Sequence, residues 1–166
     1  MGPNLQFPFN SRSFFTDEGR RPIGGGLELW RGYFQSIRPA QAKMYLNVDI
    51  ATGIMFKQGP LIQLCLEYLN DKEPRRLSRL NDRDRISLQR FITNLRVVTS
   101  HGGRTQTRAI KKLTPQGANA VMFTPRDGGP SQSVADYFRR ELNKPLKFPE
   151  LICIEVGHDS EKLNTC

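Results

Sequence analysis

Hydrophobic and polar positions alternate along much of the first sixty residues, which is typical of β-strands. Alternating runs cover residues 27–35, 43–50 and 53–57, and residues 49–53, at the junction of the last two, predict a turn. Before them, residues 1–23 carry three prolines and two pairs of phenylalanines, which we interpret as an extended arm whose aromatic side chains pack elsewhere. The first third of the chain is therefore expected to be rich in β-structure.

From Pro60 onward the apolar positions take helical spacing. The pattern predicts a helix over residues 61–69, a second over 83–95 capped by Asn81 or Asp82, and a third over 134–142 capped by Ser131 or Ser133. In the second helix the apolar positions expected to face inward are Ile86, Leu88, Phe91, Ile92 and Leu95. Further strands are predicted at residues 96–100, 104–113, 118–124 and 151–156.

This order of elements favours an α+β unit with a small barrel over an alternating βαβ arrangement. The pattern changes near residues 56–60, which we take as a candidate domain boundary. A chain of 166 residues is long enough for one domain and an arm, and an apolar fraction of 37% is enough to form a core.

Several protein classes are excluded by composition. No apolar run approaches the roughly 20 residues of a membrane-spanning helix, and the first residues lack a secretory pattern. The cysteines Cys65, Cys153 and Cys166 are odd in number and lack CxxC spacing, and the chain has only two histidines. We therefore expect neither a disulfide scaffold nor a metal or other cofactor, and a reducing compartment: the cytoplasm, with the nucleus as the alternative.

The positive charge is concentrated in one segment. Residues 75–112 contain eleven bases and two acids, which accounts for the whole net charge of +9, and nine of the eleven bases are arginine. Arginine makes planar, bidentate contacts with phosphate, so a polyanion such as nucleic acid is one candidate partner. A solvated helix face without a partner is the alternative, and charge alone does not decide between them.

The sequence offers little for catalysis, so we do not expect an enzyme. A nucleophile with a base and an orienting group, paired carboxylates and a phosphate-binding loop are all lacking. Binding of single-stranded nucleic acid is better supported, because aromatic faces lie among the bases. Tyr137 is the amphipathic candidate, whereas His101 in a turn and Phe123 or Phe138 in a core are the structural alternatives.

Long runs of residues resemble a known family. Ser13-Phe14-Phe15, the run GGGLELWRGYFQSIRP (24–39) and the run KMYLNVD (43–49) resemble the first linker of eukaryotic Argonaute proteins. The runs SVADYF (133–138) and LKFPELICIEVG (146–157) resemble the PAZ domain of that family. The resemblance covers about residues 10–157. It implies an arm and L1-type linker over 1–57, a PAZ domain over 58–157 and a divergent tail over 158–166.

The resemblance also implies a fold and a function. The PAZ fold is a small OB-like β-barrel with an appended strand–helix module, here preceded by a β-rich linker. In that family PAZ holds the single-stranded 3′ end of a small guide RNA, as in a two-nucleotide overhang, during RNA silencing. Slicing belongs to a separate PIWI domain, so this chain is expected to bind RNA without cutting it. Contacts with other Argonaute domains are expected, and membrane or metal partners are not.

Individual residues carry over unevenly. His101 matches a pocket histidine that contacts phosphate, Phe123 the aromatic under the terminal nucleotide, and Tyr137 a tyrosine whose hydroxyl meets the last phosphodiester. The strand that begins at Arg104 matches a segment with Arg and Tyr ligands. There Gln106, Thr107 and Arg108 remain open alternatives, of which we favour Arg108.

The chain lacks tyrosine hydroxyls at two places where the family has them. It has no tyrosine in that basic strand, and Leu142 stands where relatives often have Tyr or His, a loss of roughly 1 kcal/mol for each missing hydroxyl. Arg140 and Lys144 are candidates to compensate, and Lys162 is a candidate for a pocket lysine. Because the sequence after Gly157 diverges, we expect a fragment or a truncated product. The alternative function is a protein-interaction fragment with a degenerate pocket, in which Phe14, Phe15, Trp30 and Phe34 supply the interface.

Overall fold

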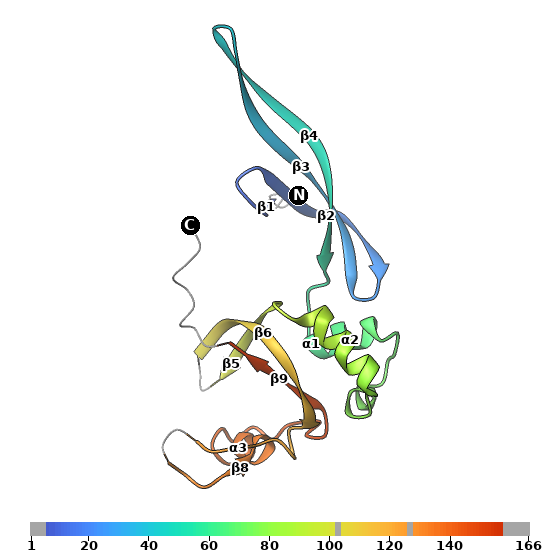
Figure 1. Ribbon diagram of the computed structural model, residues 1–166, viewed down its shortest axis with the longest axis vertical. Helices are drawn as coiled ribbons and strands as arrows, with labels where there is room; N and C mark the ends of the chain where they lie inside the picture. Colours follow the sequence, from blue (N-terminus) through green and yellow to red (C-terminus); the bar gives the residue numbers. More distant parts are fainter. Residues whose placement is uncertain (1–5, 102–103, 126–127, 158–166) are drawn as a thin grey trace. The chain divides into compact units, whose positions relative to one another are not determined.

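The computed structural model describes residues 6–101, 104–125 and 128–157 (Figure 1). Contacts along the chain divide it into two compact units, residues 1–70 and 71–166. We call these the N-terminal unit and the C-terminal unit, and each is described by itself. Among the described residues, no helix is both long and apolar enough to cross a membrane.

The N-terminal unit is an antiparallel sheet followed by one helix. Its strands are β1 (Gln6–Pro8), β2 (Ser13–Gly24), β3 (Leu27–Ala40) and β4 (Lys43–Phe56), hydrogen-bonded in that order, and α1 (Leu61–Tyr68) follows. Figure 1 shows β3 and β4 as a long two-stranded hairpin that extends beyond β2. Thus the predicted arm is part of this sheet.

The predicted turn at residues 49–53 is wrong, because β4 runs unbroken through it and the hairpin turns instead beside Ala42, whose φ is 58°. Gly53 serves a different purpose. A Cβ atom there would lie 2.8 Å from Cε1 of Phe15, so the absent side chain makes room for a buried ring. Such a long-range packing requirement leaves no local sign in the sequence.

Aromatic side chains from β1 to β3 pack on their own sheet. The rings of Phe7 and Trp30 lie 5.4 Å apart, those of Phe14 and Tyr33 stack at 5.4 Å, and Phe15 and Trp30 are buried. The buried Glu28 accepts a hydrogen bond of 3.2 Å from Nε1 of Trp30. Phe15 and Trp30 are therefore core residues, which contradicts their predicted role in an exposed interface.

Helix α1 completes the core of the N-terminal unit. It buries Leu64, Cys65 and Leu66, and Leu64 packs so closely on Gly26 that a Cβ atom there would lie 2.6 Å from Cδ1 of Leu64. Burial raises the pKa of the Cys65 thiol to about 11. The helix is also joined to the strand end by an ion pair of 2.5 Å between Lys57 and Glu67.

The C-terminal unit begins with the 3₁₀ helix η1 (Pro74–Ser78) and α2 (Asp82–Ile92). The antiparallel strands β5 (Arg96–His101), β6 (Arg104–Gly117) and β9 (Ile152–Val156) form one sheet. The short strands β7 (Met122–Phe123) and β8 (Gln132–Ser133) form a separate pair, followed by α3 (Val134–Arg140). We call the last three elements the β7–β8–α3 module. Because the described strands form no closed barrel, the predicted OB-like barrel is not confirmed.

The core of this unit lies between α2 and the sheet. Leu88 and Ile92 are 0% exposed, one helical turn apart, and Oε1 of Gln89 accepts a hydrogen bond of 3.1 Å from the backbone N–H of Leu113 on β6. Asn81 caps the helix, as predicted, by accepting from the N–H of Asp84 at 2.7 Å. Ile86 is 43% exposed, against the prediction, because it lies about 200° around the helix from Leu88.

Residues 118–121 do not form the predicted strand. The N–H of Ala118 donates to the carbonyl of Leu151, and that of Asn119 to Pro149, so this segment is bonded to the connection that precedes β9. Gly117 permits the approach, since a Cβ atom there would lie 2.4 Å from the carbonyl oxygen of Glu150. These contacts attach the β7–β8–α3 module to the end of the three-stranded sheet.

Candidate nucleic-acid interface

The first group of predicted site residues lies on the β5–β6 ribbon. The register pairs His101 with Arg104 at its end and Val97 with Arg108 further along. The backbones of His101 and Arg104 are thus brought together, while their side chains lie outside the described residues. Nε of Arg108 donates to Oε1 of Gln106 at 3.0 Å, and its Nη2 donates to the same oxygen.

This amide orients the Arg108 guanidinium without neutralising it. Within the part of the chain that the structure describes, no carboxylate pairs with Arg108, so its charge remains available to an anion. Gln106 and Arg108 are both half-buried, whereas Thr107 between them is exposed on the other side of the strand. The sequence alone does not decide which of these three residues contacts RNA. Because Gln106 and Arg108 are two residues apart on a strand, they are expected to share a face.

The second group lies in the β7–β8–α3 module. The rings of Phe123 and Tyr137 meet edge to face with centroids 5.3 Å apart, and Phe138 follows Tyr137 at 6.2 Å. Ser133 places this helix: its Oγ accepts from the N–H of Asp136 at 3.0 Å, which confirms the predicted cap. Phe123 and Tyr137 thus come from different elements and form one half-buried aromatic pair.

The remaining candidates follow α3. Arg140 and Lys144 are exposed, and the backbone N–H of Lys144 donates to the carbonyl of Phe138 at 2.9 Å, which fixes the chain just after the helix. Arg139, by contrast, is paired with Asp136 at 2.7 Å. Lys162 lies outside the described residues. Leu142 is half-buried and adds no polar group to this surface.

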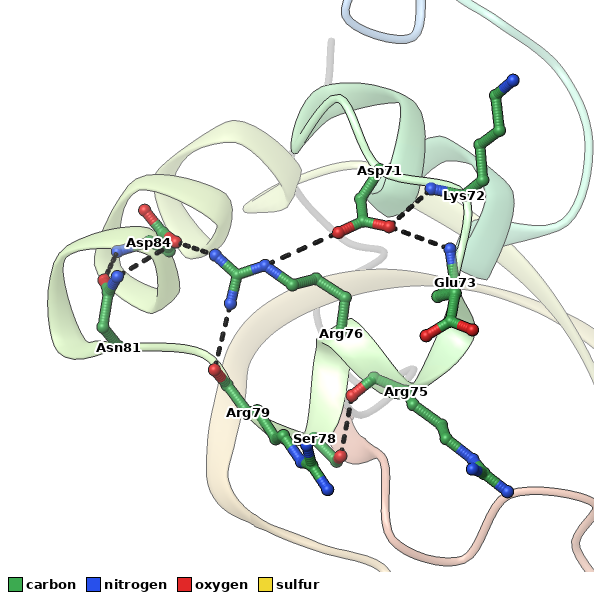
Figure 2. Close-up of polar contacts among 9 residues, drawn as sticks. All are labelled: Asp71, Lys72, Glu73, Arg75, Arg76, Ser78, Arg79, Asn81 and Asp84. Carbon is green, nitrogen blue, oxygen red and sulfur yellow. Dashed lines mark hydrogen bonds and ion pairs between the residues drawn. The ribbon is translucent and has the colours of Figure 1, made fainter.

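One arginine of the basic segment has a structural role. Figure 2 shows the Arg76 guanidinium between two carboxylates: its Nη2 bonds to Oδ2 of Asp84, and its Nε lies 3.8 Å from Oδ2 of Asp71. Its Nη1 also donates to the carbonyl oxygen of Arg79 at 3.0 Å. Backbone N–H groups of Glu73 and Lys72, together with Arg76, lower the pKa of Asp71. We call this arrangement the Arg76 clamp, and it joins η1 to the first turn of α2.

Comparison with known proteins identifies the class first. Residues 10–57 match the model of the Argonaute linker 1 domain, and residues 62–165 match that of the PAZ domain. The chain is therefore a linker followed by a PAZ domain.

Its relatives identify the family. The chain is 35% identical over 161 residues to protein argonaute MEL1 of Oryza sativa subsp. japonica, a match that covers 95% of this chain. It is 36% identical over 152 residues, 87% of its length, to protein argonaute of Schizosaccharomyces pombe. The chain belongs to the Argonaute family. It spans 15% and 18% of the lengths of these two relatives.

A solved structure agrees on the fold. Kluyveromyces polysporus Argonaute, in a crystal structure with a guide RNA, superimposes with a TM-score of 0.58 over 94% of this chain and 20% of that protein, at 18% sequence identity. At this identity the similarity concerns the fold alone.

Proposed function

We propose that this chain holds the 3′ end of a small guide RNA, as a single-stranded two-nucleotide overhang, and does not cut RNA itself. The observation that carries the proposal is the pairing of Phe123 with Tyr137 in a unit that also contains unneutralised cations. An aromatic face stacks on a base of any sequence, and a tyrosine hydroxyl can donate to a phosphate oxygen. Membership of the Argonaute family supports small RNA as the ligand.

The same proposal assigns the neighbouring cations to the backbone of the overhang. Arg108, oriented by Gln106, supplies a held guanidinium, while Arg140 and Lys144, in and just after the helix that carries Tyr137, supply exposed charges. We include His101, Arg104 and Lys162 on the strength of the family resemblance. We propose the lack of slicing because the family resemblance assigns slicing to a PIWI domain, whereas the regions that match here are linker 1 and PAZ. Other Argonaute domains are the remaining proposed partners.

A binding titration tests the proposal. A short RNA duplex with two-nucleotide 3′ overhangs should bind more tightly than the blunt duplex of equal length. Replacing Phe123 and Tyr137 together by Ala should abolish that preference, since each stacked base is worth about 1–3 kcal/mol. Equal affinity for both duplexes would overturn end recognition. Incubation of a labelled RNA with the protein and Mg²⁺ should give no shorter product.

Two further variants control for folding. Tyr137→Phe keeps the ring that packs on Phe123 and removes the hydroxyl, so its affinity should fall by only about 2- to 12-fold. Tyr45→Ala removes an exposed ring from the N-terminal unit and should leave the overhang preference unchanged.

One observation favours the alternative function, a protein-interaction fragment. On β4 and its partner strand, an exposed apolar face contains Ile37, Met44, Leu46, Val48 and Ile50. Exposed apolar area of this kind is typical of interaction surfaces. Self-association of the purified protein, together with no RNA binding at low salt, would support that alternative.

A further inference from the structure

The arginines of η1, of its C-cap Arg79 and of α2 fall into two kinds. Arg76 is held by Asp71 and Asp84, and Arg85 lies 3.5 Å from Asp82. The other four are exposed, and none of them forms an ion pair with any residue that the structure describes: Arg75, Arg79, Arg83 and Arg90. We call these four the arginine surface.

Helix geometry places two of the four together. Arg83 and Arg90 are seven residues apart on α2, so they lie about 20° apart around the axis and roughly 10 Å apart along it. Leu88 and Ile92 lie on the opposite side of the helix, where they are fully buried. The two guanidinium groups therefore project from the side of α2 that faces away from the core.

The Arg76 clamp holds the backbone of the segment that carries the other two against the first turn of α2. Arg76 bonds to Asp84 in the first turn of α2 and to the carbonyl of Arg79, and Oγ of Ser78 donates to the carbonyl of Arg75 at 2.8 Å. In Figure 2 the guanidinium groups of Arg75 and Arg79 are directed away from the clamp. Because their backbones are already ordered, less conformational entropy is lost when a ligand binds.

The chemistry of the surface indicates its ligand. All four cations are guanidinium groups, which bind phosphate oxygens in a bidentate manner. A repeating anion such as a phosphodiester backbone can contact several of these groups at once. We propose that the arginine surface binds the phosphodiester backbone of RNA as a contact separate from the residues of the 3′-end site, and that it needs no free RNA end.

An RNA without ends tests this separately from the proposed function. The probe is a covalently closed RNA dumbbell, and the protein is the full 166-residue chain. We expect binding that weakens steeply with salt, and in the Arg83→Gln/Arg90→Gln variant about tenfold weaker binding at low salt. The slope of log affinity against log salt should become shallower by about one for each arginine–phosphate interaction that the substitutions remove. The Phe123→Ala/Tyr137→Ala variant should bind the dumbbell as the wild type does.

The matched control removes equal charge elsewhere. Arg21 and Arg38 are exposed in the N-terminal unit, and an Arg21→Gln/Arg38→Gln variant has the same net charge as the test variant. Similar losses in both variants would overturn the proposal, because net charge alone would then explain the binding. An unchanged salt dependence in Arg83→Gln/Arg90→Gln would also overturn it, as would equal displacement of the dumbbell by polyglutamate, which would indicate an acidic protein as the ligand. Unfolding midpoints of the two Arg→Gln variants that equal the wild-type midpoint would show that the substitutions leave folding unaffected.

Discussion

Replacement of Arg76 by Met should loosen the start of α2 without unfolding the protein. The substitution keeps an apolar stem of similar length and removes the guanidinium that joins Asp84 to the carbonyl of Arg79. Asp84 does not lose every donor, since its Oδ2 still accepts from Nδ2 of Asn81 at 3.2 Å. The helix cap made by Asn81 also remains.

Burial of the pair sets the size of the effect. The side chains of Arg76 and Asp84 are 32% and 30% exposed, so the pair is neither open to solvent nor fully buried. Exposed ion pairs contribute about 0–1 kcal/mol, whereas removing one partner of a buried pair costs about 3–5 kcal/mol. Because Asp84 keeps both water and Asn81 as partners, we expect a loss of about 1–2 kcal/mol.

Amide hydrogen exchange measures this loss where it occurs. A loss of 1–2 kcal/mol should speed exchange in α2 by roughly 5- to 30-fold. Trp30, the single tryptophan, lies in the N-terminal unit, so its fluorescence reports on the unit that does not contain the clamp. Arg85→Met is the matched control in the same helix, since its partner Asp82 is 91% exposed and the expected effect is under about 0.5 kcal/mol.

A double-mutant cycle with Asp84→Asn decides whether the pair itself is responsible. A coupling energy below about 0.3 kcal/mol would refute the clamp, because independent sites add within that margin. The pH dependence has a definite sign as well. The pKa of Asp71 is lowered by backbone N–H groups and Arg76, so its contribution is present above the ordinary aspartate pKa and is lost as the pH falls through the lowered value. The contribution of Asp71 should therefore be intact at pH 5, as measured by α2 amide protection relative to the intrinsic exchange rates at that pH.

Three further predictions concern the cores and the buried thiol. Leu88→Ala should destabilise the C-terminal unit by about 2–5 kcal/mol in urea unfolding followed by circular dichroism, because Leu88 is fully buried. Gly32→Ala should lower the midpoint of Trp30 fluorescence, since a Cβ atom would lie 2.1 Å from the backbone oxygen of Phe14; the exposed Thr52→Ala is the control, and an equal effect would contradict the clash. With a pKa of about 11, Cys65 should resist iodoacetamide at pH 8 in the native protein and react after unfolding, and rapid native labelling would show that it is not buried.

Local signals predicted much of the fold. The sequence predicts Asn81 or Asp82 and Ser131 or Ser133 as helix caps, and the structure has Asn81 and Ser133, because each accepts from an N–H three residues on, a local interaction that stabilises the helix start. The prediction of a turn at residues 49–53 is wrong because Gly53 makes room for the ring of Phe15, which lies on a different strand. The prediction that Ile86 faces inward is wrong because this apolar residue lies on the side of α2 away from the core.

The candidate site is harder to predict from residue patterns than the fold. Phe123 and Tyr137 lie on different elements, and no spacing rule predicts that their rings meet, so resemblance to the Argonaute family was needed to select them. In the sequence Gln106 is an alternative to Arg108 for the RNA-binding position, whereas in the structure it accepts a hydrogen bond from Arg108 and orients it. Partners that arise from side-chain hydrogen bonding are not visible in the sequence before the register is known.

The charge of the basic segment also changes meaning once its partners are known. Arg76, Arg85 and Lys112 are paired with acids, and two of those acids, Asp71 and Glu155, lie outside residues 75–112. The charge that remains is divided between the arginine surface of η1 and α2 and the β5–β6 ribbon, which carries Arg108. These two surfaces should therefore bind RNA independently. The affinity for an RNA without ends should measure binding by the arginine surface. The affinity added by a 3′ overhang should measure binding by the ribbon together with the aromatic pair. If one substitution removed both kinds of binding in a folded protein, the charge would act as a single field and the division into two surfaces would be wrong.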